Sequence, residues 1–433
     1  MVSVCFYFQV HQPFRIKKYS IFDIGKNDED YFSDNSQTNL DNIHILKKVA
    51  RKCYLPTNKV LLELLERHPE FKVSFSFSGV FLEQIEKYAP EVLESFQKLV
   101  KTGRVEILSE TYYHSLSFLF SKGEFIEQVK LHRDLIKRLF NQTPNVFRNT
   151  ELIYNNDLAN EIEALGYKGI VAEGADHLLS WKSPNFLYQP KGTSKIKVLL
   201  KNYRLSDDIA FRFSNRGWKE WPLNTKKFTE WVNNINGCGD VLNLFMDYET
   251  FGEHQWEDTG IFEFLRHLPS EILKHPDNNF KTLSESISSF PVRGDFDSPN
   301  FISWADIERD VSAWLGNEMQ IAAINRVYSL SQKVLKTHDE KLIHDWRKLQ
   351  TSDHFYYMCT KWFSDGDVHK YFNPYHSPYE AFITFMNVLH DLELKVNQKL
   401  KKNNSTFVLN SVPENKKNKE TQFFNPLSNL KDS

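Results

Sequence analysis

The chain has 433 residues, with 54 Lys and Arg against 56 Asp and Glu, a formal net charge of −2, and 41% hydrophobic residues. This near-neutral balance argues against a strongly basic nucleic-acid-binding protein, and the apolar content is enough for a sizeable core. The aromatic share is high at 14%, whereas glycines number only 16. The length fits one large barrel with a smaller unit, or two to three domains of ordinary size.

The N-terminal segment and the cysteines bear on the cellular location of the protein. Residues 2–10 are apolar, but no basic region precedes them and no small-residue cleavage site follows. No run approaches the roughly 20 apolar residues of a membrane-spanning helix. The cysteines lie far apart and form no Cys-x-x-Cys pair, so neither a disulfide framework nor a zinc knuckle is expected. We therefore expect a cytoplasmic protein that has no membrane partner.

Short apolar or β-branched runs alternate with helical patterns along the first two thirds of the chain. In the helical segments, apolar residues recur three and four positions apart, as in Ile43, Leu46 and Ala50. This alternation predicts parallel βαβ units and an α/β fold, namely an incomplete (β/α)7 TIM-like barrel over residues 1–295. The seven predicted strands are Val2–Phe8, Val73–Phe77, Val105–Leu108, Val146–Arg148, Gly169–Ala172, Lys197–Leu200 and Val241–Met246.

The pattern becomes purely helical after about residue 300. Apolar spacing predicts one long helix over 306–335 and a second helical stretch over 338–358. Ser377, Pro378 and Glu380 match a helix start, with a cap, a proline at the first position and a glutamate at the third, and that helix should reach about Leu400. We predict a C-terminal α-helical bundle over 296–402 that completes the active-site cleft, followed by a polar, flexible tail over 403–433.

Carboxylates and histidines gather at the predicted ends of the strands, which is where β/α barrels place their active sites. Glu151 and Asp247 follow different strands and could face each other across a sugar, as glycosidic bond cleavage requires. Met246, Phe251 and Glu249 would raise the pKa of Asp247, as a general acid needs. Each carboxylate alone could equally be a helix cap or an ion-pair partner.

Glu106 and the aromatic residues are more ambiguous. Glu106 lies within a strand, so its side chain either points inward toward a site or forms a salt bridge with an arginine. Rings such as Trp256 and Trp304, in polar surroundings, could bind the faces of sugars, although core packing is the ordinary role of aromatic residues.

Cofactor and metal chemistry find little support. No two of the 15 histidines lie two, three or four residues apart, so His-x-x-x-His and His-Glu-x-x-His are absent. Dinucleotide-binding, Walker and Gly-x-Ser-x-Gly motifs are absent as well. We expect neither a cofactor nor a metal. A zinc site assembled from His11, Asp247 and distant residues is the remaining alternative.

Five short motifs in order, spread over almost the whole chain, resemble those of glycoside hydrolase family 57, and most closely its α-amylase-like members. They are His11-Gln12-Pro13, 103–108 with its extension 110–115, Phe147-Arg148-Asn149-Thr150-Glu151, 246–252, and Gln350-Thr351-Ser352-Asp353-His354.

The resemblance implies a (β/α)7 barrel with a helical bundle, and a retaining mechanism on α-glucans without a cofactor. Glu151 stands at the family's nucleophile position and Asp247 at its general acid/base position. The positions that hold the sugar at the cleavage point are His11, Glu106 and Asp353, and the further glucan contacts are Trp256, Trp304 and His354.

Two other activities stay open at this point. A 4-α-glucanotransferase, or another α-glucan-active enzyme of the family, would use the same site with a sugar hydroxyl in place of water. A non-catalytic α-glucan-binding protein is the alternative of another class, against which the presence of both Glu151 and Asp247 argues. The expected partner is in each case an α-glucan polysaccharide or maltooligosaccharide rather than a nucleic acid. Metal-dependent deacetylation on a related barrel is a further alternative.

Overall fold

The computed structural model describes residues 2–26, 30–33, 41–361 and 373–410. In these residues, ten strands form two five-stranded sheets, in the orders β3-β2-β1-β8, with β9 beside β1, and β10-β6-β7-β5-β4. The strands are β1 (Ser3–Val10), β2 (Val73–Phe77), β3 (Val105–Ile107), β4 (Val146–Phe147), β5 (Gly169–Glu173), β6 (Leu187–Pro190), β7 (Lys197–Lys201), β8 (Val241–Asp247), β9 (Asn279–Phe280) and β10 (Val292–Phe296).

All seven predicted strands are present and are divided between the two sheets. Within the sheets β1 pairs in parallel with both β2 and β8, and β5 pairs in parallel with both β4 and β7. Two narrow seams join the sheets: a parallel bridge between Ser109 and Phe147, and a 2.9 Å hydrogen bond from the Asn202 N–H to the Asn243 carbonyl. The fold is therefore the α/β barrel type that the sequence predicts, with β6, β9 and β10 as strands that the apolar pattern did not predict.

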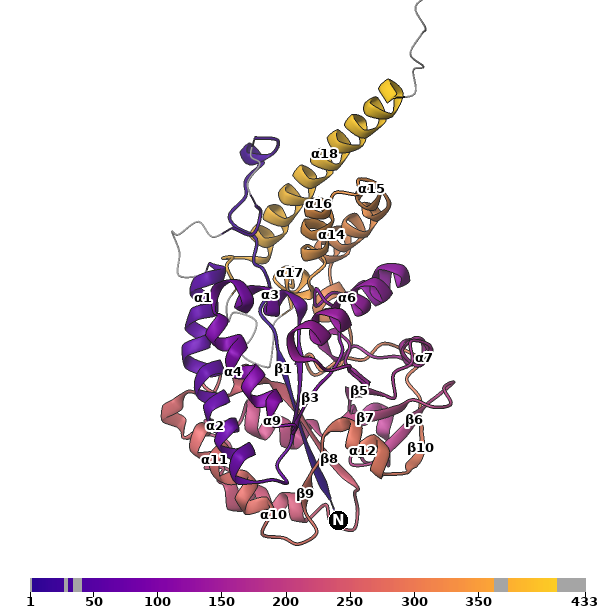
Figure 1. Ribbon diagram of the computed structural model, residues 1–433. Coiled ribbons are helices and arrows are strands. Elements are labelled where there is room, and N and C mark those ends of the chain that lie inside the picture. Colours follow the sequence, from indigo (N-terminus) through magenta and orange to yellow (C-terminus); the bar gives the residue numbers. More distant parts are fainter. Residues whose placement is uncertain (1, 27–29, 34–40, 362–372, 411–433) are drawn as a thin grey trace, which may run out of the picture.

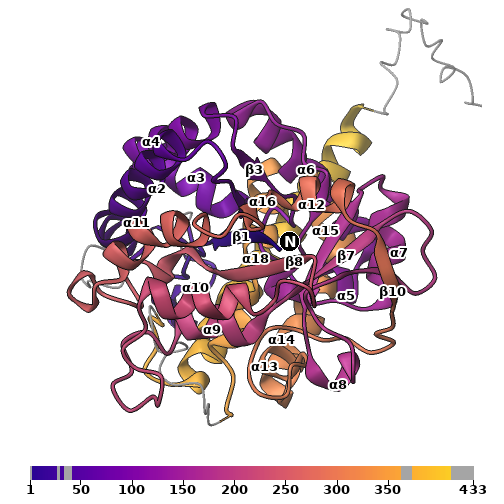
Figure 2. The same cartoon turned by 90° about the horizontal axis from the view of Figure 1, so that it is seen from below.

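The central strands are buried, because helices cover the sheets from outside. Every residue of β1 is buried, as a central strand of a parallel sheet requires. Viewed from below, β1 and β8 lie near the middle, with helices such as α2, α4, α7 and α11 around them (Figure 2). The barrel helices are α1 (Asn42–Val49), α2 (Leu55–Arg67), α3 (Gly79–Tyr88), α4 (Pro90–Lys101), α5 (Ser117–Phe120), α6 (Lys122–Phe140), α7 (Asn156–Ala164), α8 (Asp176–Leu179), α9 (Tyr203–Ala210), α10 (Thr225–Asn233), α11 (Ile261–Ile272) and α12 (Leu283–Ser289).

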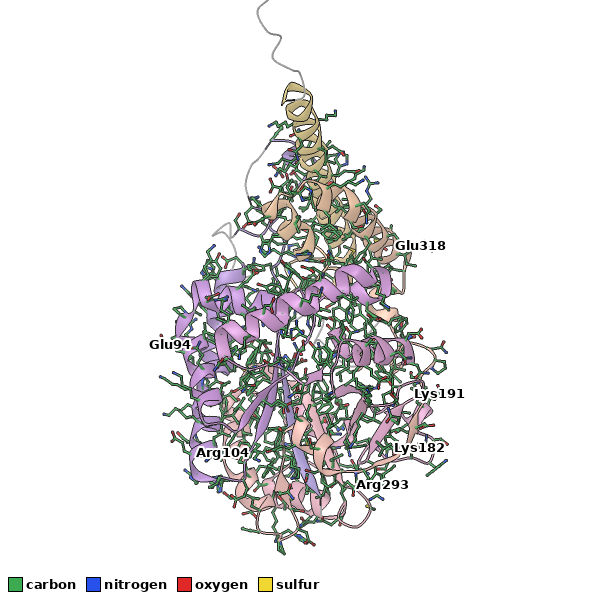
Figure 3. All side chains as sticks on the ribbon, turned by 45° about the vertical axis from the view of Figure 1, so that its right-hand side comes forward. Glu94, Arg104, Lys182, Lys191, Arg293 and Glu318 are labelled. Atoms are coloured by element: carbon green, nitrogen blue, oxygen red, sulfur yellow. The ribbon has the colours of Figure 1, made fainter. Side chains whose placement is uncertain are left out.

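The C-terminal helices pack over one end of the barrel (Figure 1). The amino end of β1 lies at the opposite end, so the carboxyl ends of the parallel strands face these helices. Charged side chains such as Glu94, Lys191 and Glu318 project outward from the ribbon (Figure 3). The bundle helices are α13 (Ser312–Leu315), α14 (Glu318–Ser329), α15 (Ser331–Lys336), α16 (Glu340–Lys348), α17 (Ser352–Tyr356) and α18 (Pro378–Asn410).

The long helix predicted over 306–335 is wrong, because the chain breaks it into three. Asp306 and Arg309 have positive φ angles of 56° and 53°, which a right-handed helix excludes. Asn317 then caps α14 by accepting the Gln320 N–H, while the Gln320 side chain accepts the Asn317 N–H. Apolar spacing continues through the breaks because all three helices, α13, α14 and α15, bury one face in the same core, so periodicity alone could not reveal them.

The start of the last helix is as predicted, whereas its end is not. The Ser377 hydroxyl accepts the Glu380 N–H at 3.1 Å, and the Glu380 carboxylate accepts the His376 N–H at 2.8 Å. Helix α18 continues to Asn410, so the first part of the predicted tail is helical, and residues 411–433 lie outside the described residues. None of the described helices has the length and apolarity that crossing a membrane would require. The division into domains at residues 295 and 296 stays a prediction.

Gly252, in the loop after β8, should be intolerant of a side chain. Its φ is +106°, and a Cβ would stand 1.9 Å from the Lys52 carbonyl oxygen. We expect Gly252→Ala to lower the free energy of unfolding by about 3 kcal/mol, measured by urea titration. Gly103→Ala is the matched control, since φ there is +76° with no atom within 4 Å, and strain alone should cost about 1–2 kcal/mol. An equal loss of unfolding free energy in Gly252→Ala and Gly103→Ala would show that the contact with Lys52 is unimportant.

Candidate active site

A cleft of about 730 Å³ opens at the carboxyl ends of the strands and is lined by both parts of the chain. From the barrel come His11 after β1, Glu151 after β4 and Asp247 at the end of β8. From the C-terminal part come Trp304 and, on α17, Asp353. The structure thus brings together five of the eight predicted site residues in one cavity.

Glu151 is held in an unusual conformation. Its φ is +58°, in the left-handed region that side chains rarely adopt. One carboxylate oxygen accepts the Ser352 hydroxyl at 3.2 Å and lies 3.3 Å from His114 Nε2, and the other accepts the Trp304 indole N–H at 2.8 Å. Burial raises the pKa of the Glu151 carboxyl, but the hydrogen bond and charge of His114 outweigh it and hold that pKa below its ordinary value. The side chain is thereby kept ionised.

His114 lines the cleft and connects two carboxylates, those of Glu110 and Glu151. Its Nδ1 lies 2.9 Å from Glu110, and its Nε2 faces Glu151. Burial lowers the pKa of the imidazole, but the hydrogen bonds to Glu110 and Glu151 raise it to about 9 overall. His114 therefore carries a positive charge at neutral pH. The same ion pair, against the opposing effect of burial, lowers the pKa of Glu110 to about 2.

His11 and Asp353 form a pair across the boundary between barrel and bundle. His11 Nε2 lies 2.9 Å from Asp353 and its Nδ1 lies 2.6 Å from the Ser78 hydroxyl. The His11 ring also stacks on His114, with centroids 3.9 Å apart. Burial and the positive charge of His114 lower the pKa of His11, although Asp353 opposes both. The polar edge of His11 is thus fixed at the cleft wall.

The pKa of Asp247 is shifted in the opposite direction from that of Glu151. Burial, together with the negative charge of Glu151, raises the pKa of Asp247 to about 6, although Arg148 opposes the rise. Its neighbour Glu249 is buried and accepts the Tyr54 hydroxyl at 2.5 Å, and burial with the charge of Asp247 raises the pKa of Glu249 to about 8. One carboxylate of the cleft is thus ionised while another can hold a proton near neutral pH. This is the division of states that acid–base chemistry on two carboxyl groups requires.

Three predicted site residues lie elsewhere, and Glu106 is the clearest of them. Its carboxylate accepts the Ser284 backbone N–H at 3.1 Å, the Ser284 hydroxyl and the Ser74 hydroxyl. Ser284 is in the first turn of α12, which follows β9, and β9 pairs with the amino end of β1. Glu106 therefore lies at the end of the barrel remote from the cleft, as an anionic partner of a helix N-terminus.

His354 and Trp256 are also outside the cleft. His354 is buried between Phe32 and Phe385 in the helical core, and burial lowers its pKa to about 4. It follows Asp353 on α17, and a step of one residue turns a helical side chain by about 100°, away from the cleft. Trp256 is 53% exposed, with the Lys52 ammonium 5.3 Å from its ring centre. It does not line the cleft, although His254, two residues earlier, does.

Several residues of the site were not singled out from the sequence. Glu110 and His114 belong to the extension of the second motif, four residues apart, and an acid with a histidine at that spacing is a signal that could have been used. Arg148 is fully buried, with its guanidinium 3.9 Å from the Glu110 carboxylate and 5.0 Å from the Trp304 ring centre. Ser352 precedes Asp353. The partners of Arg148 and Ser352 come from distant segments, so local spacing in the sequence does not predict these contacts.

A metal centre was the competing possibility. Within 2–26, 30–33, 41–361 and 373–410, no group of three or more His, Cys, Asp or Glu side chains is arranged to hold a metal ion. His11 faces Ser78 and Asp353.

Comparison with known proteins gives independent evidence for the family to which the chain belongs. Residues 5–299 match the model of glycosyl hydrolase family 57. A Methanocaldococcus jannaschii protein named "Putative alpha-amylase" is 45% identical over 412 residues, covering 92% of this chain and 86% of its own. The Thermococcus litoralis 4-alpha-glucanotransferase is 24% identical over 250 residues, which is 57% of this chain and 37% of that enzyme.

A solved structure agrees on the fold. The family 57 type branching enzyme of Pyrococcus horikoshii superposes with a TM-score of 0.68 at 15% identity, over 93% of this chain and 91% of that one. The family match covers well over half of the chain, and a relative of high identity spans nearly all of it. The chain therefore belongs to glycosyl hydrolase family 57 and is a glycoside hydrolase.

Proposed function

We propose that this protein is a retaining, α-amylase-type hydrolase that cleaves α-1,4-glucosidic bonds through a covalent intermediate on Glu151, with Asp247 as general acid/base. The observation that carries the proposal is the placement of two carboxyl groups in one cleft whose pKa values are shifted in opposite directions, that of Glu151 lowered and that of Asp247 raised to about 6. The names of the relatives, alpha-amylase and 4-alpha-glucanotransferase, support an α-glucan as substrate.

The reaction proceeds in two displacements. The Glu151 carboxylate attacks the anomeric carbon while Asp247 gives its proton to the departing glycosidic oxygen. Asp247, now ionised, takes a proton from water, whose oxygen attacks the same carbon as the bond to Glu151 breaks. Two inversions leave the sugar in its original α configuration. Asp353, which lines the cleft and has one oxygen paired with His11, holds a hydroxyl of the sugar at the cleavage point in this mechanism, and His11 positions it.

The products decide between hydrolysis and transfer. Incubation with maltoheptaose, followed by chromatography and an assay of reducing ends, should give shorter chains and a steady rise in reducing ends. Chains longer than the substrate, with constant reducing ends, would instead identify a 4-α-glucanotransferase, which the name of the Thermococcus litoralis relative keeps as the second candidate. Binding of the glucan with neither change would identify a non-catalytic glucan-binding protein.

The pH dependence should follow the two carboxyl groups. The first displacement needs Glu151 ionised and Asp247 protonated. Because the pKa of Asp247 is raised to about 6, kcat/KM should fall tenfold per pH unit above that value. Because the pKa of Glu151 is lowered, the acidic limb should lie below the ordinary glutamate range. Initial rates on maltoheptaose, whose leaving group needs a proton, between pH 3 and 9 would measure both limbs, and a rate still rising above pH 7 would contradict the assignment of Asp247.

A further inference from the structure

The segment that carries Trp304 is fastened to the segment that carries Glu151. Ile302 and Tyr154 exchange two backbone hydrogen bonds, each of 2.9 Å, and the Trp304 N–H donates to the Glu151 carbonyl at 3.2 Å. The left-handed backbone of Glu151 is therefore supported directly by residue 304. These contacts are all made by main-chain atoms, so replacement of the Trp304 side chain leaves them in place.

The Trp304 side chain is directed at the carboxylate. Its indole N–H donates to one Glu151 oxygen at 2.8 Å, whereas His114 and Ser352 face the other oxygen. Two cations lie over the indole ring, with Arg148 5.0 Å and Lys201 5.4 Å from its centre. Such cations occupy ring surface that a stacked sugar would need. The contacts therefore fit a hydrogen-bond donor to Glu151 better than the sugar platform that the sequence predicts.

Arg309 holds the loop after Trp304 in place. It donates to the Trp304 carbonyl at 2.7 Å and to the fully buried Glu173 at 3.1 Å. Its other nitrogen lies 3.7 Å from Asp207, which also binds Lys201 at 3.0 Å. The loop therefore has charged anchors on the barrel strands and helices, and the indole N–H has little freedom to leave Glu151.

We propose that Trp304 acts on the nucleophile, stabilising the Glu151 carboxylate as the leaving group of the second displacement, and that Arg309 is its positioning residue. This inference rests on the proposed function. In the second step the water oxygen bonds to the anomeric carbon, Asp247 takes a water proton, and the electron pair of the breaking C–O bond returns to Glu151. The carboxyl group is neutral as an ester and anionic afterwards, so a donor to its oxygen favours this step and slightly opposes the first.

Loss of the indole N–H should therefore lower kcat without changing kcat/KM. With a dinitrophenyl α-maltooligosaccharide, whose first step is fast, Trp304→Phe should lower kcat roughly tenfold and KM by the same factor, leaving kcat/KM nearly unchanged. Rapid mixing should then show a burst approaching one dinitrophenol per active site. Intact-protein mass spectrometry and peptide mapping should find the accumulated sugar on Glu151.

Matched variants make the result specific. Trp181→Phe makes the same change at a residue that is 88% exposed and does not line the cleft, and should behave as wild type. Arg309→Met should reproduce the joint fall of kcat and KM although the indole is intact, and Arg309→Lys should restore most of the loss, since an ammonium group can still bind Glu173.

Two kinetic outcomes would overturn the inference. A rise in KM at constant kcat in Trp304→Phe would make the indole a sugar platform. Equal losses of kcat and kcat/KM, without a burst, would place its effect in the first displacement or in folding. Failure of the proposed function is distinguishable, because wild-type protein would then form no sugar adduct on Glu151 with any α-glucan substrate, and the inference would fall with it.

Discussion

Glu151→Ala should lower the turnover of maltooligosaccharides by at least about 10³-fold, because it removes the group that forms the covalent intermediate. The side chain is surrounded by three donors, from His114, Ser352 and Trp304, that an alanine leaves without their acceptor. Glu151→Gln is the less disruptive companion, since it keeps the shape and removes the charge. Turnover measured by release of reducing ends would give both values.

The configuration of the product formed with added azide tests whether Glu151 is the nucleophile. In Glu151→Ala the anion can enter the space of the missing carboxylate and displace a good leaving group once, which gives a β-glycosyl azide. Glu94→Ala removes an exposed carboxylate on the barrel surface and should leave the rate unchanged (Figure 3). Activity of Glu151→Ala close to wild type, or an azide product of α configuration, would assign the nucleophile to another residue.

Asp247→Ala should lower the rate of hydrolysis of natural α-glucans by about 10²- to 10⁴-fold, because a poor leaving group then departs without a proton. A dinitrophenyl maltooligosaccharide needs no such proton, so its first step should be nearly as fast as in wild type and the glycosyl-enzyme should accumulate. The limb of the pH profile assigned to Asp247, whose pKa is about 6, should disappear. Rates on both substrates between pH 4 and 8 would measure these effects.

Azide also separates Asp247 from Glu151. With Glu151 intact, azide attacks the covalent intermediate from the face that Asp247 has vacated, and the product is an α-glycosyl azide. Asp258→Ala, at an exposed position beyond the cleft, is the matched control and should keep the wild-type rate and pH profile. If Asp247→Ala slowed both substrates equally and kept the alkaline limb, the general acid would have to be sought elsewhere, with Glu249 the first candidate.

The local pattern of the sequence was sufficient for the strands and for the ends at which the carboxylates stand. Short runs rich in apolar and β-branched residues identify β1, β5 and β8, because such runs are typical of strands buried in a helix-covered parallel sheet. Residues at or shortly after the carboxyl ends of parallel strands emerge at the rim, which is why Glu151, after β4, and Asp247, at the end of β8, line the cleft as expected. The Ser377 cap of α18 is similarly local, since its partner is three residues away.

The tertiary structure alone decided which way the side chains point and which distant residues they contact. Glu106 and Glu110 are separated by four residues, yet one binds the N-terminus of α12 at the far end of the barrel and the other binds His114, which lines the cleft. The break after residue 306 was likewise invisible, because apolar periodicity records only which face is buried. Glu151 meets Trp304 and Ser352 through contacts that span 153 and 201 positions. Packing of the bundle on the barrel creates such contacts, and their distances set the protonation of the site, so no local spacing in the sequence encodes them.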